Sequence, residues 1–355
     1  MRDPICNMDV EDDRFTYEFE GRKFHFCSLG DLEKFKANPK GFADKYAYDL
    51  IIIGAGPAGL TASVYASTLK MSTLLLTENI GGQPVESSKI VNYMGFEFIS
   101  GSELIRLFRK QLLEQHYIDH YIDSVSNVEK KGNSFLVSTT SGKKFQSDAV
   151  IVAAGMQRAK LNVPGEEKLL RRGVFYTFAV DSSILAGKPV AVIGGGNSAL
   201  QAALEFAKYK CPINLISKGP WKADPSIVEQ VKQLADLTVL DSHQVVEVKG
   251  EDKVESIVVK NLKNNEETVH AVNGVLIAIG QTPNSYLVQS LVDLSEKNEI
   301  VIAPDCSTRT PGLFACGDVT NLPDKRIIIA SGEGAKAALA ARRYIFKLAP
   351  YITHI

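Results

Sequence analysis

The sequence lacks the features that mark membrane, secreted and nucleic-acid-binding proteins. Its 355 residues contain no apolar run near the ~20 residues that a membrane-spanning helix needs. The first 13 residues match neither a signal peptide nor a transit peptide. Lys and Arg (40) balance Asp and Glu (41), so no overall charge favours nucleic acid or an anionic membrane. The five cysteines are odd in number and scattered, unlike a secreted disulfide framework. We therefore expect a cytoplasmic protein that binds neither nucleic acid nor membrane.

One strand–glycine turn–helix–strand pattern occurs twice in the chain. The first copy consists of a strand over 49–53, the turn Gly54-Ala-Gly56-Pro-Ala-Gly59, a helix to Ala66 and a strand over 73–77. The second consists of a strand over 190–193, the turn Gly194-Gly-Gly196-Asn-Ser-Ala199, a helix to Ala207 and a strand over 213–216. This is the context that a dinucleotide-binding fingerprint requires.

The spacing of the glycines has a physical explanation. The first glycine permits a tight turn, the second lets the backbone approach a pyrophosphate, and the third small residue lets the helix pack on the strand. The N-terminus of the helix then faces the phosphates. The alternative is that both are only tight strand-to-helix turns. Two correctly framed copies favour two bound dinucleotides.

The remaining elements extend the pattern. Strands over 148–155 and 274–280 close the two units, and 312–319 reads as a short strand ending in a Gly-Asp turn before a helix. Residues 245–272 look like antiparallel strands joined by polar turns.

The arrangement resembles the two-dinucleotide-binding flavoprotein superfamily and, within it, the low-molecular-weight thioredoxin reductases. The strings that carry this resemblance are Gly81-Gly-Gln83, Val91-Asn-Tyr-Met-Gly95, Arg172-Gly-Val174 and Phe314-Ala-Cys-Gly-Asp318. Three others look closest to the flavoprotein subunit of alkyl hydroperoxide reductase: Glu78 to Gln83, Lys222-Ala-Asp224 and Ile327 to Lys336. The resemblance covers about residues 47–350.

The resemblance implies an α/β fold with two Rossmann-like three-layer domains, plus a small α+β N-terminal module. The FAD-binding domain would be discontinuous (47–160 and 284–355), with the NAD(P)-binding domain (161–283) inserted and the module at 1–45. Relatives are generally homodimers, and their inserted domain swivels on two short crossing strands.

The resemblance also implies the cofactor-binding residues. Those expected to bind FAD are Gly54, Gly56, Pro57, Ala58, Gly59, Glu78 (adenosine ribose), Gly82, Gln83 and Asn92 (beside the isoalloxazine), Ala154, Gly155, Gly317, Asp318, Arg326 and Ile327. Those expected to bind the nicotinamide nucleotide are Gly194, Gly195, Gly196, Asn197, Ser198, Ser217, Lys218 and Gly280.

The chain departs from the family at its redox dithiol. The two cysteine positions are Thr177 and Val180, and only the following acid, Asp181, remains. Neither replacement provides a thiolate nucleophile, so direct thioredoxin reduction by the usual route is excluded. Asp181 and Arg326 are candidate catalytic residues. Arg326 stands where relatives have Gln, and either favours an anionic reduced flavin or faces solvent.

Three interpretations of the missing dithiol remain open. Reduced FAD passes electrons directly to an acceptor, such as a ferredoxin or flavodoxin, a quinone, a small disulfide or a metal ion. Alternatively, another part of the chain supplies a dithiol, or the nicotinamide half is a relic. The cofactor is expected to be NADPH, because no acid follows the second unit's strand and Lys218 could pair with a 2′-phosphate; the alternative is that Lys218 is an ordinary surface lysine.

The N-terminal 45 residues resemble the small YHS metal-binding domain. The matching strings are Asp3-Pro-Ile-Cys6-Asn-Met8 and Gly21-Arg-Lys-Phe-His25-Phe-Cys27-Ser, and Asp31 replaces the family's last cysteine. A β-hairpin and a short helix would bring Cys6 and Cys27 to one ion, with His25 or Asp31 completing a zinc or copper site. The alternatives are a docking module with buried cysteines, or a dithiol that replaces the lost pair.

These inferences predict an FAD-dependent enzyme that oxidises NAD(P)H and reduces an unidentified acceptor, with a small redox protein as one candidate. The alternative is a metal- or redox-sensing flavoprotein in which the YHS-like module binds metal and catalysis is vestigial.

Overall fold

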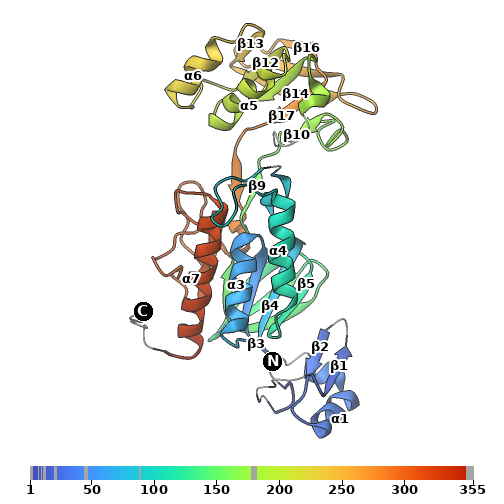
Figure 1. Cartoon of the computed structure of the whole chain (residues 1–355), viewed down its shortest axis with the longest axis vertical. Helices are drawn as coiled ribbons and strands as arrows, with labels where there is room; N and C mark the ends of the chain where they lie inside the picture. The colour runs from blue at the N-terminus through green and yellow to red at the C-terminus, as the bar shows by residue number, and fades with distance from the viewer. Residues whose placement is uncertain are drawn as a thin grey trace. The chain divides into compact units, whose positions relative to one another are not determined.

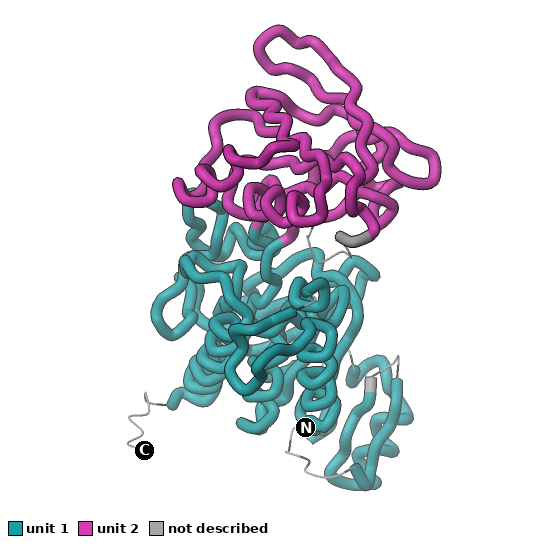
Figure 2. Tube along the Cα trace, turned by 45° about the horizontal axis from the view of Figure 1, so that its top comes forward, with its two compact units in different colours: residues 1–156, 283–355 teal, residues 157–282 magenta. Residues whose placement is uncertain are grey.

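The computed structural model describes residues 3–6, 8, 10, 13–19, 22–43, 47–87, 89–176 and 182–348. The chain divides into two compact units, unit 1 (residues 1–156 and 283–355) and unit 2 (residues 157–282) (Figure 2). Two strands that pair with each other, β9 (Met156–Arg158) and β18 (Gln281–Pro283), carry the chain between the units. The predicted FAD and nicotinamide segments fall in units 1 and 2 respectively, apart from residues 157–160 and 283.

The main sheet of unit 1 has the strand order β5-β4-β3-β8-β7-β6, and β19 also pairs with β8. Its parallel strands are β3 (Ala47–Ala55), β4 (Thr73–Ile80), β5 (Ile118–Ile122), β8 (Lys144–Val152) and β19 (Leu313–Ala315). The antiparallel strands are β6 (Val125–Lys131) and β7 (Ser134–Thr139).

Both faces of this sheet are buried, which explains the apolar runs in its strands. Side chains alternate across a strand, so β3 sends Leu50 and Ile52 into one core and Ile51 and Ile53 into another. Helices α3 (Pro57–Thr68), α4 (Gly101–Leu113) and α7 (Ile327–Ile345) cover the first face (Figure 1). The β6–β7 hairpin and the 3₁₀ helix η3 (Ser285–Val288) pack into the second core. Two further 3₁₀ helices in unit 1 are η1 (Gln83–Glu86) and η4 (Gly317–Val319).

Unit 2 contains a parallel sheet of order β10-β17-β11-β12-β13. Its strands are β10 (Val174–Phe175), β17 (Gly274–Ile277), β11 (Val190–Ile193), β12 (Ile213–Ser217) and β13 (Leu237–Asp241). The unit's helices are η2 (Ser182–Leu185), α5 (Asn197–Lys208) and α6 (Pro225–Lys232). The antiparallel strands predicted within 245–272 are present as β14 (His243–Lys249), β15 (Ser256–Asn261) and β16 (Glu267–Ala271).

The N-terminal module has a hydrophobic core of its own. Strands β1 (Thr16–Phe19) and β2 (Arg22–His25) form a hairpin, followed by α1 (Leu29–Ala37) and α2 (Pro39–Ala43). Phe35 is fully buried at the centre, and the aromatic rings that surround it among the described residues are those of Tyr17, Phe19, Phe24, Phe26 and Phe42. The predicted hairpin and short helix are therefore present, and the predicted fold class is confirmed for all three parts. Among the described ranges, no helix has the length and apolar character needed to cross a membrane.

Candidate dinucleotide and metal sites

The first glycine turn joins β3 to α3, and each glycine has its own structural reason. Gly54 has a φ of +101°, and a Cβ there would lie 2.4 Å from the carbonyl oxygen of Ala153. A Cβ at Gly59 would lie 1.8 Å from the carbonyl oxygen of Gly54, so only glycine lets the helix pack this closely. Gly56, the N-cap of α3, is different, because a Cβ there would meet no other atom within 4 Å. The backbone at Gly56 is therefore open to approach from outside the protein, which is the condition that a bound pyrophosphate would require.

Two further predicted FAD residues lie at this helix N-terminus. A Cβ on Gly82 would lie 3.2 Å from Cα of Gly56, and one on Gly317 would lie 2.9 Å from Cβ of Ala58. Pro57 is the first residue of α3, a position where the missing N–H costs nothing. The structure therefore brings Gly56, Ala58, Gly82 and Gly317 together where the helix dipole favours an anion.

The turn at Gly317 is held by Glu333 of α7, a residue that sequence reasoning missed. Its Oε2 accepts the Gly317 N–H at 2.7 Å, and its side chain is buried. The next residue, Gly334, would place a Cβ 2.1 Å from the carbonyl oxygen of Ala58, so α7 packs closely on α3. Burial raises the pKa of both Glu333 and the half-buried Asp318.

Replacing Glu333 by alanine should destabilise the protein and weaken FAD binding. The buried Gly317 N–H would lose its acceptor, at a cost of about 1–3 kcal/mol in unfolding free energy. Glu333→Gln keeps an acceptor and should lose less. Burial raises the pKa of Glu333 in the folded protein, so the wild type loses stability as pH rises through that pKa. Glutamine does not ionise, so the difference in unfolding free energy between the wild type and Glu333→Gln should shrink as pH rises. Urea unfolding at several pH values measures this, and equal losses in both variants would contradict it.

Other predicted FAD residues in unit 1 occupy separate positions around the sheet. Glu78, exposed at the end of β4, accepts a hydrogen bond from Ser124 Oγ at 2.5 Å. Gln83 donates through Nε2 to the carbonyl oxygen of Met156 at 2.7 Å. Asn92 lies exposed in the loop between Ile90 and Ile99.

The last of these residues lie after β8 and at the start of α7. Asn284 holds Ala154 and Gly155 by donating to their carbonyl oxygens at 2.8 and 3.0 Å. Arg326 is the exposed N-cap of α7, where its Nη1 donates to the carbonyl oxygen of Lys325 at 3.0 Å, and Ile327 is the first helical residue. Sequence reasoning missed Ser124 and Asn284, because each acts on a residue far away in the chain.

The second glycine turn, between β11 and α5, repeats the first. Gly194 has a φ of +138°, and its Cβ would lie 2.2 Å from the carbonyl oxygen of Ala278 and 3.1 Å from Cβ of Ala199. Gly195 would come within 3.5 Å of Ser217 and Trp221. Gly196 is the N-cap of α5 and, like Gly56, would place a Cβ within 4 Å of no other atom.

The remaining predicted nicotinamide residues surround that turn. Asn197 exchanges two hydrogen bonds with Asp224, at 2.7 and 3.0 Å, and Ser198 is exposed on the first turn of α5. Ser217 ends β12 and donates to Asp241 Oδ1 of the neighbouring strand at 3.3 Å. Lys218 is exposed. Gly280 has a φ of +106°, and a Cβ there would have no neighbour within 4 Å.

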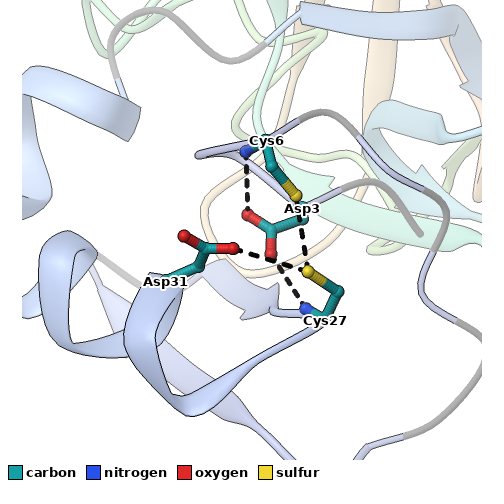
Figure 3. Close-up of side chains that lie close together, drawn as sticks. All are labelled: Asp3, Cys6, Cys27 and Asp31. Carbon is teal, nitrogen blue, oxygen red and sulfur yellow. Dashed lines mark hydrogen bonds between the residues drawn. The ribbon is translucent and has the colours of Figure 1, made fainter.

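A cluster of two cysteines and two aspartates lies in the N-terminal module (Figure 3). One ligand atom from each of Asp3, Cys6, Cys27 and Asp31 lies within 4.8 Å of all the others. Asp3 was not predicted. His25 was a candidate ligand, but the structure places it outside the cluster: its Nδ1 lies 3.0 Å from Asp13 Oδ1.

The cluster opposes ionisation of the Cys27 thiol in the absence of a cation. The nearby thiol of Cys6, followed by burial and the carboxylates of Asp3 and Asp31, raises the pKa of the Cys27 thiol to about 12. A bound divalent ion would reverse this effect by stabilising the thiolate. Two sulfurs and two carboxylates are a donor set that fits zinc.

The other cysteines are inaccessible. All five lie in the described part of the chain and none is in a disulfide. Cys211, Cys306 and Cys316 are buried, and burial raises the pKa of each thiol. The family's dithiol positions, Thr177 and Val180, and the candidate catalytic residue Asp181 lie outside the described residues.

The chain thus contains two strand–glycine turn–helix units, and the segment that carries the second is inserted into the first. The family model for pyridine nucleotide-disulphide oxidoreductases matches residues 48–342, and the chain belongs to this family of flavoprotein oxidoreductases. A YHS domain model matches residues 1–46.

Two individual relatives show which members of the family this chain is similar to. The F subunit of alkyl hydroperoxide reductase in Staphylococcus epidermidis is 35% identical over 312 residues, covering 86% of this chain and 61% of the relative. The corresponding protein of Staphylococcus aureus is also 35% identical, covering 88% of this chain and 62% of its own length. The chain thus spans about three fifths of the length of these relatives.

Solved thioredoxin reductases are similar over their full length. That of Lactococcus lactis, in its FR conformation, is 32% identical with a TM-score of 0.70, and the match covers 85% of this chain and 100% of that one. That of T. acidophilum is 30% identical with a TM-score of 0.67, covering 85% and 99%. The predicted resemblance to thioredoxin reductases and to the flavoprotein of alkyl hydroperoxide reductase is confirmed.

Proposed function

We propose that this protein binds FAD in unit 1 and NAD(P)H in unit 2, oxidises the nicotinamide nucleotide, and reduces an acceptor without a family-type dithiol. The observation that carries the proposal is the pair of N-cap glycines, Gly56 and Gly196. Each has an allowed extended backbone and no neighbour within 4 Å of a Cβ, beside glycines that tight packing explains. Bare backbone at a helix N-terminus fits a pyrophosphate.

The residues around the first turn would each have a separate role. Gly54, Gly56, Ala58 and Gly59 would present the backbone of α3 to the FAD pyrophosphate, with Gly82 and the Gly317–Asp318 turn beside it. Glu78, oriented by Ser124, would accept hydrogen bonds from the adenosine ribose. When bound, FAD supplies two-electron chemistry, which depends on positioning more than on acid–base groups of the protein.

The absence of the family's dithiol restricts the acceptors that the flavin could reduce. Thr177 and Val180 provide no thiolate, and three of the five cysteines are buried. We therefore propose that electrons pass directly to a ferredoxin or flavodoxin, a quinone, a small disulfide or a metal ion. A panel of such acceptors, assayed by NAD(P)H consumption, tests this. Turnover with at least one and none with thioredoxin is expected, whereas efficient thioredoxin reduction would contradict it.

We propose NADPH as the preferred nucleotide, on the basis of Lys218. No acid ends β12, and the exposed ammonium of Lys218 follows Ser217, where a 2′-phosphate would be recognised. The nearby acid is Asp241 at the end of the neighbouring strand β13, and its carboxylate is already engaged, because it accepts hydrogen bonds from Ser217 and from the backbone N–H of Ser242.

Replacing Lys218 by alanine should raise the KM for NADPH about three- to tenfold, because a charge-assisted contact to phosphate is lost. The KM for NADH should stay the same, since NADH has no 2′-phosphate. Lys208→Ala is the control, because Lys208 is the last residue of α5, at the end of the helix away from the glycine turn. Steady-state kinetics with both nucleotides measures the difference, and equal KM increases would rule out the proposed role.

A second candidate function, metal binding, is favoured by the Asp3–Cys6–Cys27–Asp31 cluster. We propose that the N-terminal module binds zinc there, and zinc retention after gel filtration, compared between the wild type and Cys6→Ser, tests this proposal. Separately, we propose that the protein forms the homodimer usual among its relatives, which sedimentation tests. The same cluster would serve the alternative in which the module senses metal and catalysis is vestigial.

A further inference from the structure

The sulfur atoms of the two accessible thiols are farther apart than in a disulfide and closer together than two thiolates on one zinc ion. Cys6 Sγ and Cys27 Sγ are 3.4 Å apart, and they come from segments 21 residues apart in the chain (Figure 3). Two thiolates on one tetrahedral zinc, with bonds of about 2.3 Å, would be ~3.8 Å apart. Two sulfurs in a disulfide are about 2.05 Å apart. The pair therefore needs a movement of only ~0.4 Å to bind zinc and of ~1.4 Å to form a disulfide.

Asp3 holds the two segments together without help from the sulfurs. Asp3 is buried, with 1% of the residue exposed, and its Oδ1 accepts the backbone N–H of Ile5 at 2.7 Å. Its Oδ2 accepts the backbone N–H of Cys27 at 2.8 Å. The carboxylate thus ties the N-terminal segment to the end of the hairpin, and the thiols stay opposed whether or not they are bonded.

The second carboxylate lies beside the same sulfur. Asp31 Oδ2 is 3.4 Å from Cys27 Sγ and also accepts from Ser28 Oγ at 3.2 Å. Its other oxygen pairs with Lys34 Nζ at 3.1 Å. The oxygen facing the thiol is therefore in position to share a cation with Cys27, and Lys34 reduces the cost of gathering negative groups.

We propose that Cys6 and Cys27 form a redox-gated metal site, an inference that rests on the proposed zinc site of the module. Reduced, the two thiolates bind zinc together with the carboxylates. A small disulfide oxidises the pair: the Cys6–Cys27 bond forms, the oxidant's S–S bond breaks, its two sulfurs take up two protons and leave as thiols, and zinc is released as Zn²⁺. Reduction by thiols reverses the reaction.

The two states exclude each other for chemical reasons. A disulfide sulfur has no thiolate charge to give to a borderline-soft ion, and the two carboxylates alone are a weak set for zinc. Oxidation is also selective. Cys6 is exposed and Cys27 is half-buried, while the other three thiols are buried.

The test uses the full-length protein with FAD present. Reduced protein is loaded with zinc, freed of excess, and treated with oxidised glutathione. Released zinc is measured with a chromogenic chelator, and free thiols are counted after denaturation. We expect stoichiometric zinc before oxidation, and its loss together with two thiols that peptide mapping assigns to Cys6 and Cys27. Reduction with dithiothreitol, followed by removal of the reductant and addition of zinc, should restore both thiols and zinc binding.

Controls separate failure of the gate from failure of the metal site. Zinc bound by reduced protein but retained after oxidation, or released without a Cys6–Cys27 disulfide, would overturn the gate and leave the metal site intact. No more zinc in the reduced wild type than in Cys6→Ser/Cys27→Ser would overturn both. Asp3→Asn should weaken zinc binding at least about tenfold, whereas Asp13→Asn, in the same module but outside the cluster, should not. Unchanged flavin absorbance and circular dichroism confirm that each variant is folded.

Discussion

Replacing Gly56 by valine should give a folded protein that no longer holds FAD. Gly56 has a φ of −74° and a ψ of −175°, which valine adopts without strain, and a Cβ there meets no protein atom within 4 Å. The loss of a favourable N-cap should cost no more than about 1–2 kcal/mol of stability. The added methyl groups would occupy the space through which a pyrophosphate approaches the helix. We therefore expect FAD affinity to fall about a hundredfold or more.

The measurement is flavin absorbance after purification, followed by titration of the apoprotein with FAD monitored by flavin fluorescence. Gly332→Ala is a matched control, because Gly332 lies in α7 at an exposed position, also without neighbours within 4 Å. It should retain full FAD. Wild-type affinity in Gly56→Val would show that the first turn does not bind the pyrophosphate.

The equivalent substitution in unit 2, Gly196→Val, should leave FAD binding intact and impair reduction of the flavin by NAD(P)H. Gly196 has a φ of −97° and a ψ of 178°, again an extended conformation open to valine. The variant should purify with full FAD, because the first glycine turn is untouched. Reduction of its flavin by NAD(P)H should slow about a hundredfold or more, since the helix N-terminus of α5 would be blocked.

Stopped-flow absorbance with each nucleotide measures this effect. Dithionite, which needs no binding site, should still bleach the variant fully and so serves as its internal control. If Gly196→Val were reduced by NAD(P)H as fast as the wild type, the second turn would have no part in the reaction.

The sequence was most informative where the backbone itself forms the site. Gly54, Gly59 and Gly194 are required by local geometry, because a Cβ at any of them would strike a carbonyl oxygen within 2.4 Å. Such requirements leave a regular spacing in the sequence. The strand–turn–helix order and the fold class could therefore be predicted, as could the antiparallel strands of unit 2.

Side chains that act across the fold could not be predicted in this way. Glu333 reaches Gly317 from 16 residues away, and Asn284 reaches Ala154 from 130 residues away. Asp3 lay within the string compared with the YHS family, but its contact with Cys27 depends on how two segments meet. His25 had the chemistry of a ligand, yet its ring nitrogen pairs with Asp13, which is outside the cluster. Spacing alone indicates none of these partners.

The central claim is that a nicotinamide nucleotide reduces the flavin of this protein directly, and an anaerobic titration tests it. The purified protein is titrated with NADPH and, separately, with NADH, while the visible absorbance of the flavin is recorded. We expect stoichiometric bleaching, with NADPH acting faster or at lower concentration. If neither nucleotide bleached the flavin and dithionite did, the second dinucleotide unit would not deliver electrons, and the proposed function would be wrong.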